Sequence, residues 1–135
     1  MDWSGRRRYL PAVGFSLLIL VTSLLPIPEG PSEQIPLLLG VPLDKWVHAA
    51  SYGTLTAVLA WGRRAHGWVT VAALAAVAVL FGAGVELFQG FVPSRGTSGA
   101  DFFANSVGAA MAGLVWFVTH RTGVLSNQTD PQSRR

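Results

Sequence analysis

Four long stretches without Asp, Glu, Lys or Arg limit the fold of this chain more than any other feature. They cover residues 9–28, 46–62, 65–85 and 102–119, and they consist mainly of Leu, Val, Ala and Phe. A helix needs about 20 residues to cross the roughly 30 Å hydrocarbon core of a bilayer. Each stretch is near that length, and none shows the sustained two-residue alternation of a barrel strand. The sequence therefore predicts an all-α membrane protein with four transmembrane helices.

The composition agrees with this prediction. Charged residues make up 13% of the chain and hydrophobic residues 50%, whereas ordinary soluble domains are about 25% charged. The 135 residues leave room for one unit. We expect a basic N-terminal segment over 1–8, a helical membrane domain over 9–120 and a disordered tail over 121–135. The absence of cysteine excludes disulfides and thiolate chemistry.

The distribution of basic residues predicts the orientation in the membrane. Lys and Arg gather on the cytoplasmic side of membrane proteins. One side of the predicted helices carries Arg6, Arg7, Arg8, Arg63, Arg64, Arg121, Arg134 and Arg135, and the other carries Lys45 and Arg95. Both termini should therefore be cytoplasmic in a multi-pass protein of the cell membrane. The net charge of +3 then reflects topology, and we expect no nucleic-acid partner.

Two segments allow further interpretation. The basic N-terminus followed by an apolar run is also typical of a signal peptide, but it offers no clear small-x-small cleavage site, so we interpret it as a transmembrane helix.

The connection over 26–42 holds five of the eight prolines. Such a segment is stiff and extended, and its apolar half, IPLLLGVP, is expected along the outer membrane surface.

Polar side chains gather toward the predicted outer ends of three helices. At about 100° per residue, Asp44, His48 and Tyr52 share one stripe. The next two helices bring Glu86, Gln89, Asp101 and Asn105 to the same depth. A charge inside a bilayer costs about 2.5–3.5 kcal/mol and survives mostly by pairing or by facing a wet cavity. The pattern predicts a polar pocket near the outer face.

Small residues on the same faces support close packing beneath this pocket. They are Ala75, Ala78 and Gly82 in the third predicted helix, and Gly108 and Ala112 in the fourth. Small residues let membrane helices approach closely. We therefore expect the polar groups above them to be drawn together.

Each polar residue also has a simpler interpretation. Asp44 is a good helix N-cap, and Ser98 with Asp101 has the spacing of a capping pair. Trp46 and Tyr52 are typical of an interfacial aromatic belt, and Gln89 and Asn105 could only join helices. Glu86 differs, because an anion near a helix C-terminus is disfavoured by the helix dipole. It should need a partner, and Lys45, His48 and Arg95 are nearest in depth.

The arrangement of these residues resembles a known family. Asp44-Lys45-x-x-His48-x-x-x-Tyr52 is followed by Glu86-x-x-Gln89, and then by PSRGTSGADFFANSVGAAMAG, which contains Arg95, Ser98, Asp101, Asn105 and Gly108. This combination resembles the VanZ-like family of small membrane proteins over roughly residues 12–120. The resemblance implies a protein linked to the cell envelope. The founding member is associated with resistance to the lipoglycopeptide teicoplanin, but the resemblance supplies no reaction.

Two active roles follow from the pocket. In the first, it binds or modifies a lipid head group, a lipid-linked cell-wall intermediate or a lipoglycopeptide. The expected binding residues are Asp44, Lys45, Tyr52, Gln89, Arg95, Ser98 and Asn105. In the second, the chain is an intramembrane hydrolase or transferase with catalytic residues His48, Glu86 and Asp101, where His48 acts as base and Ser98 is the first nucleophile to test.

Two weaker interpretations remain. A metal could be held by His48, Glu86, Asp101 and Asp44, but only one histidine reaches this depth and carboxylates bind zinc less selectively. We therefore expect no metal and no cofactor. Alternatively, the cluster is a structural clasp that fixes helix register without a ligand. The sequence leaves the oligomeric state open.

Overall fold

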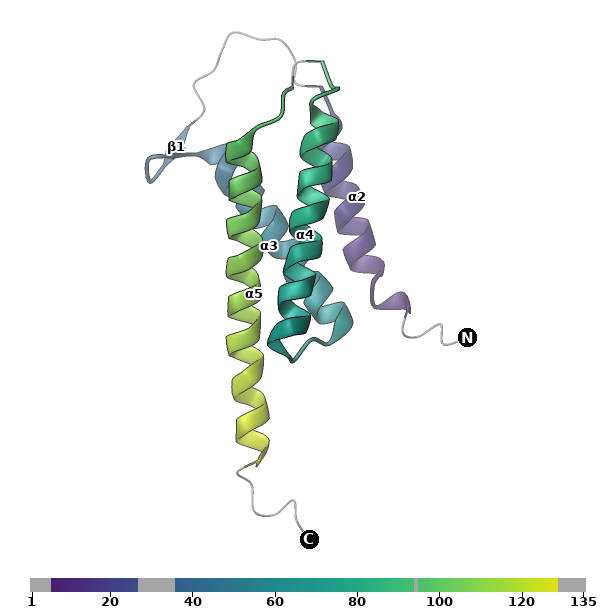
Figure 1. Ribbon diagram of the computed structural model, residues 1–135, viewed down its shortest axis with the longest axis vertical. Coiled ribbons are helices and arrows are strands. Elements are labelled where there is room, and N and C mark those ends of the chain that lie inside the picture. Colours follow the sequence, from purple (N-terminus) through teal and green to yellow (C-terminus); the bar gives the residue numbers. More distant parts are fainter. Residues whose placement is uncertain (1–5, 27–35, 94, 129–135) are drawn as a thin grey trace.

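The computed structural model describes residues 6–26, 36–93 and 95–128 of the chain. Within these residues the main elements are four helices, α2 (Leu10–Leu24), α3 (Leu43–Arg63), α4 (Trp68–Gln89) and α5 (Gly99–Gln128). Successive helices run in opposite directions (Figure 1). The end of the bundle where α4 leads into α5 is called the upper end, and the end where α3 turns into α4 the lower end. The predicted all-α class is confirmed.

Local sequence explains where the helices begin and end. α2 ends at Leu24, short of the predicted residue 28, because Leu25 precedes Pro26 and adopts an extended conformation, with φ −67° and ψ 131°. α4 begins at Trp68 and continues to Gln89, so Glu86 and Gln89 lie on the helix. α5 continues past His120 to Gln128, whereas a disordered tail was expected from residue 121. Residues 129–135 lie outside the described part of the chain.

A small antiparallel hairpin precedes α3. Its strands are β1 (Leu37–Leu38) and β2 (Val41–Pro42), and Leu38 pairs with Val41. Leu39 and Gly40 form the turn with positive φ values of 55° and 77°, as a two-residue hairpin turn requires. Residues 27–35 of the predicted extended connection lie outside the described part. The hairpin lies beside the bundle at its upper end (Figure 1). Leu37, Leu38 and Leu39 are exposed.

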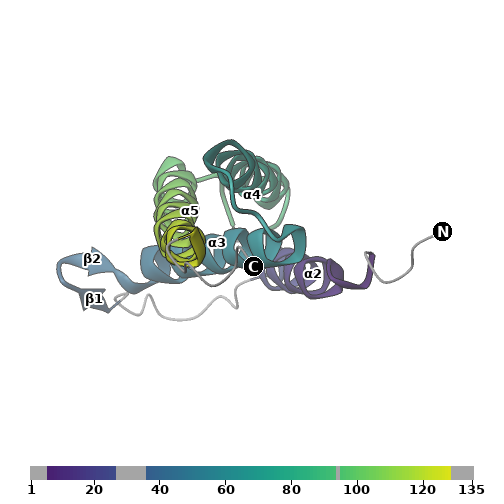
Figure 2. The same ribbon diagram turned by 90° about the horizontal axis from the view of Figure 1, so that it is seen from below.

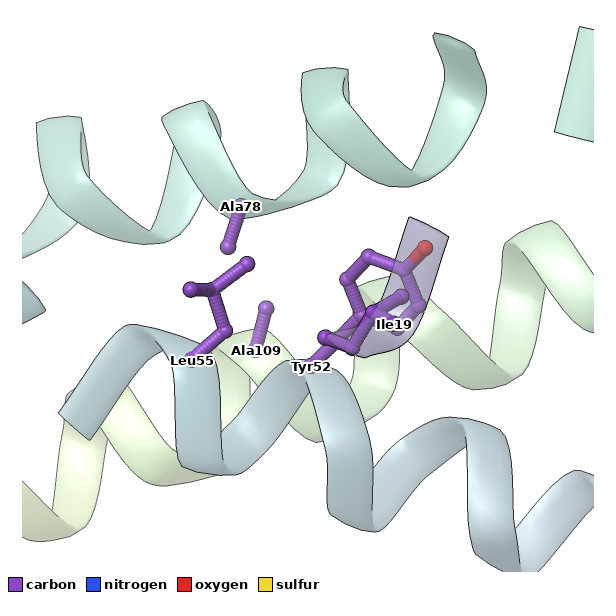
Figure 3. Close-up of a cluster of buried hydrophobic side chains, with 5 residues drawn as sticks. All are labelled: Ile19, Tyr52, Leu55, Ala78 and Ala109. Atoms are coloured by element: carbon purple, nitrogen blue, oxygen red, sulfur yellow. The ribbon is translucent and has the colours of Figure 1, made fainter. Parts of the chain in front are cut away.

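The core forms where α3 crosses α4 and α5. Ile19, Tyr52, Leu55, Ala78 and Ala109 meet there, from all four helices (Figure 3). α3 packs closely against α5, since a Cβ at Gly108 would collide with the carbonyl of Ala49. α3 lies across α4 and α5 rather than parallel to them (Figure 2). The predicted close approach at small residues is confirmed at this crossing.

Two of the helices are long and apolar enough to cross a membrane. α4 has a mean hydropathy of 2.2, and the Gly99–His120 part of α5 a value of 1.5. Only 28% of the most apolar 18-residue part of each of these helices is buried inside the protein. Their outer surfaces carry large apolar side chains, including Leu80, Leu87, Phe103 and Leu114. This low burial differs from that of a core helix in a soluble protein, which is mostly buried, and makes both helices candidate membrane spans.

Candidate functional site

An ion-pair cluster joins α3 and α5 at the upper end. The Lys45 ammonium donates hydrogen bonds to Asp44 Oδ2, at 2.6 Å, and to the Asp101 carboxylate. Asp44 and Lys45 precede the apolar stretch 46–62. Asp101 lies in the first turn of α5, where the helix dipole favours an anion. One cation thus links two carboxylates from two helices.

The cluster shifts the pKa values of its members. Burial alone would raise the pKa of the Asp44 carboxyl, but the hydrogen bond and charge of Lys45 outweigh burial, and the pKa lies below its ordinary value of 3.8. Burial alone would lower the pKa of Lys45. The hydrogen bonds and charges of Asp101 and Asp44 outweigh that effect, and the pKa lies above 10.5. Both groups are therefore held in their charged forms.

His48 lies one turn further along α3. Its Nδ1 is 3.0 Å from Asn105 Oδ1, and because a carbonyl oxygen only accepts, Nδ1 donates in this contact. Its Nε2 lies 3.9 Å from Asp101 Oδ1, beyond hydrogen-bonding distance. His48 is therefore oriented by Asn105 and only approached by Asp101.

Glu86 is connected to the start of α5. Its Oε1 accepts the backbone N–H of Ser98 at 2.5 Å, and Ser98 Oγ accepts the backbone N–H of Asp101 at 3.2 Å. The expected cationic partners form other contacts: Lys45 with the two aspartates, His48 with Asn105. The Ser98 cap expected from the sequence is confirmed. Asp44 is not an N-cap, because α3 already begins at Leu43 after Pro42 and carries Asp44 in its first turn.

A cavity of about 220 Å³ opens between α2, α3 and the end of α4. Four predicted site residues line it: His48, Tyr52, Gln89 and Arg95. The remaining lining residues are Ile19, Thr22, Ser23, Val47 and Ser51. This upper cavity therefore has the Arg95 guanidinium, the His48 imidazole and several hydroxyl and amide groups, and no carboxylate among its lining residues.

Arg95 and Gln89 also close the end of α2. Arg95 donates to the carbonyls of Leu25, at 2.8 Å, and Thr22, at 3.4 Å. Gln89 Nε2 donates to the carbonyl of Ser23 at 3.0 Å. The last carbonyls of a helix have no partner within it, and cations near them are favourable. These contacts are with neutral groups, so Arg95 forms no ion pair with any carboxylate of the described chain.

Tyr52 is a buried residue rather than a member of an interfacial belt. It is 2% exposed, and its ring packs over Gly82, where an added Cβ would lie 2.8 Å from the tyrosine Cε1. Asn105 contacts the same glycine, since its Nδ2 would be 3.2 Å from that Cβ. Gly82 thus provides the space in which side chains from α3 and α5 meet the α4 backbone.

Two buried polar atoms of the site have no hydrogen-bond partner in the described chain. They are Asp44 Oδ1 and Asn105 Nδ2, and Asn105 is only 1% exposed. A buried polar atom without a partner costs about 1–3 kcal/mol.

Most, but not all, of the residues that form this end of the protein were predicted from the sequence. Asp44, Lys45, His48, Asp101 and Asn105 form one contact group, and His48 connects it to the upper cavity. Glu86 joins through Ser98. The contribution of α2 was missed. Its only signal was that Thr22 and Ser23 interrupt the apolar run LLILVTSLLP at the same end.

The geometry also bears on catalysis and on metal binding. Ser98 Oγ, the first expected nucleophile, accepts a backbone hydrogen bond as a helix cap, and among the described residues no His, Asp or Glu side chain forms a hydrogen bond with it. Across the described residues, no three His, Asp or Glu side chains are grouped so that they could hold a metal ion. The arrangement is suited to hydrogen bonding and to charge recognition.

Comparison with known proteins identifies no relative. No protein-family model, no curated protein and no solved structure matches this chain.

Proposed function

We propose that this protein is a multi-pass membrane protein whose upper cavity binds the anionic head group of an envelope amphiphile. Candidate ligands are a lipid head group, a lipid-linked cell-wall intermediate and a lipoglycopeptide. The observation that carries the proposal is the charge of this cavity: Arg95 lines it without an ion-pair partner in the described chain, and no carboxylate is among its lining residues.

The four-helix topology in the membrane is part of the proposal. α4 and α5 supply two helices of suitable length and hydropathy. The 21 residues of α3 give a length of about 32 Å at 1.5 Å per residue, with Asp44 and Lys45 at the water boundary. The 15 residues of α2 are short for a span, and bilayer thinning would accommodate them at modest cost. The excess of arginine at the lower end supports cytoplasmic termini and an outward-facing upper end.

An apolar groove near the cluster supports an amphiphilic ligand. It has a volume of about 290 Å³ and lies between α3 and α5. Its lining includes Lys45, Trp46, Ala49, Phe103 and Val107. The groove shares Lys45 with the ion-pair cluster, and its apolar surface at the upper end could hold an acyl chain.

Binding is better supported than catalysis or a purely structural clasp. His48 and Asp101 do not form a hydrogen bond, and Ser98 serves as a cap. A purely structural clasp would not require the polar cavity that lies beside the cluster at His48. Membership of the VanZ-like family, and with it a role in teicoplanin resistance, rests on the motif residues and belongs to the same proposal.

A blocking substitution tests the proposal without removing a contact that holds the fold. Ser51→Leu would fill part of the upper cavity, and Thr54→Leu is its matched control, since Thr54 is exposed on the same helix and does not line the cavity. Purified variants in nanodiscs would be titrated with teicoplanin and with a polyprenyl phosphate. We expect Ser51→Leu to weaken binding of at least one probe tenfold or more, with no change for Thr54→Leu. Equal binding by both variants would reject this site.

Arg95 can be tested separately. Arg95→Lys keeps the charge but loses the planar, bidentate fork, whereas Arg95→Gln loses the charge. If the cavity recognises an anion, Arg95→Gln should bind these probes much more weakly than Arg95→Lys, at equal thermal stability. Equal loss of binding in both variants would instead show that Arg95 serves to cap the C-terminal end of α2.

A further inference from the structure

A second cavity lies at the lower end, away from the site described above. Its volume is about 430 Å³. It is lined by Arg8, Trp61, Arg64, Ala65, His66, Trp116 and His120. These residues come from the segment before α2, from the last turn of α3, from the turn between α3 and α4, and from the lower part of α5. In the sequence the arginines indicated only topology, and the histidines were given no role.

The charge of this lower cavity is one-sided. Arg8 and Arg64 bring two guanidinium groups to it, and His66 and His120 add two imidazoles. The acidic residues of the described chain are Asp44, Glu86 and Asp101, which all lie at the upper end. No described carboxylate lines this cavity beside the two arginines, so an anion that entered it would meet positive charge from both.

The backbone segments that carry the two arginines are fixed by local contacts. The N–H of Ala65 bonds to the carbonyl of Ala60, and the N–H of Arg64 to that of Trp61, which is the Schellman motif that ends many helices. Its left-handed position is usually glycine, but here Arg64 occupies it with φ 51°. On the other wall, the carbonyl of Arg8 lies against Gly62, where an added Cβ would be 3.0 Å away.

The wall formed by α5 is equally fixed. Trp116 Nε1 donates to the carbonyl of Ala65 at 2.9 Å, so the α3–α4 turn is pinned to α5. The ring of His120 stacks on Trp116 with centroids 4.0 Å apart. Its Nδ1 lies 2.9 Å from the carbonyl of Trp116 and must donate to it. That contact orients the imidazole against the wall of the cavity.

We propose that the lower cavity binds a phosphate group through Arg8 and Arg64. Guanidinium groups recognise phosphate oxygens in pairs of parallel hydrogen bonds. Tryptophan is enriched at the level of lipid head groups, and Trp61 and Trp116 form the sides of this cavity. The phosphate could belong to an anionic lipid or be free in solution. This inference does not depend on the ligand of the upper cavity.

Neighbouring arginines supply a matched experiment. Arg8→Gln with Arg64→Gln removes the two lining charges. Arg7→Gln with Arg63→Gln removes the same charge from exposed positions one residue away that do not line the cavity. Both double variants therefore have the same net charge and the same bias in topology. Lipid retained by protein from phosphatidylglycerol and phosphatidylcholine nanodiscs would be measured by native mass spectrometry, and inorganic phosphate would be titrated by calorimetry.

We expect the wild type and the Arg7/Arg63 variant to retain phosphatidylglycerol in preference to phosphatidylcholine, or to bind inorganic phosphate. The Arg8/Arg64 variant should lose that binding tenfold or more. Retention of the lipid without binding of inorganic phosphate would identify a lipid phosphate, and the reverse a free one. Equal losses in both double variants would show diffuse charge instead of a site, and no binding by the wild type would overturn the proposal.

Discussion

Glu86 at the end of α4 accepts the backbone N–H of Ser98, the residue that caps α5, at 2.5 Å. In a capping box the third residue of the helix, here Asp101, would accept that N–H. Because Glu86 takes this role from another helix, the Asp101 carboxylate is left to pair with Lys45. The contact also explains how Glu86 is tolerated near the C-terminus of α4: its charge lies at the N-terminus of α5, where the helix dipole favours an anion.

Replacing Glu86 should therefore affect α5. Glu86→Leu leaves the Ser98 N–H without its partner and should lower the free energy of unfolding by about 1–3 kcal/mol. Glu86→Gln keeps a carbonyl acceptor and should cost less. Thermal unfolding of the purified variants in detergent would compare them. Equal stability of the Leu and Gln variants would mean that the Ser98 contact contributes little.

The crossing of α3 and α5 depends on Gly108. Gly108→Ala would place a Cβ against the carbonyl of Ala49, so the helices would have to separate, and overpacking of this kind costs typically about 1–3 kcal/mol and occasionally more. Gly84→Ala is the matched control, because nothing lies within 4 Å of its added Cβ and alanine favours a helix by about 0.5–1 kcal/mol. We expect a lower melting temperature for Gly108→Ala and an unchanged or higher one for Gly84→Ala. The reverse order would contradict the close crossing.

The Lys45 cluster predicts how stability changes with pH. Because the pKa of Asp44 is lowered below 3.8 by folding, its contribution is complete above that value and is lost as the pH falls through the lowered pKa. Because the pKa of Lys45 is raised above 10.5, its contribution is complete below 10.5 and is lost as the pH rises through the raised pKa. Melting temperatures would be measured from about pH 3 to about pH 11. They should begin to fall at both ends of this range.

Asp44→Asn separates the acidic limb from the other carboxylates. The variant should be less stable than the wild type at neutral pH, and the difference should shrink as the pH falls below about 4, where the wild-type carboxyl becomes protonated. A constant difference across this range would show that Asp44 does not titrate with folding.

The polar end of the protein was predictable because helical spacing fixes both face and depth. Asp44 and His48 share one face of α3, and Asp101 and Asn105 share one face of α5, so a single contact between the helices brings these side chains together. The early end of α2 was also predictable from the sequence, because Pro26 disfavours a helical conformation at Leu25. The interpretation of 9–28 as one helix gave the apolar run more weight than the proline.

The partners of Glu86 and Arg95 were not predictable in the same way. Depth along a helix does not determine which neighbour a side chain faces, and both contacts depend on how residues 95–98 fold back between α4 and α5. Arg95 reaches the carbonyls of Thr22 and Leu25, and backbone acceptors leave no signal in a sequence. The lower cavity was missed because its arginines already had an explanation in topology.

The turn between α3 and α4 gives a final prediction, one of stability alone. A side chain in the left-handed conformation costs roughly 1–2 kcal/mol, and glycine avoids this cost. Arg64, with φ 51°, should therefore tolerate glycine: Arg64→Gly should stabilise the protein by about 1 kcal/mol or leave it unchanged. Arg63→Gly, within the last turn of α3, should destabilise it by up to about 1 kcal/mol. Chemical unfolding in detergent would measure both, and a clear loss for Arg64→Gly would show that the Arg64 side chain stabilises the turn even without a bound anion.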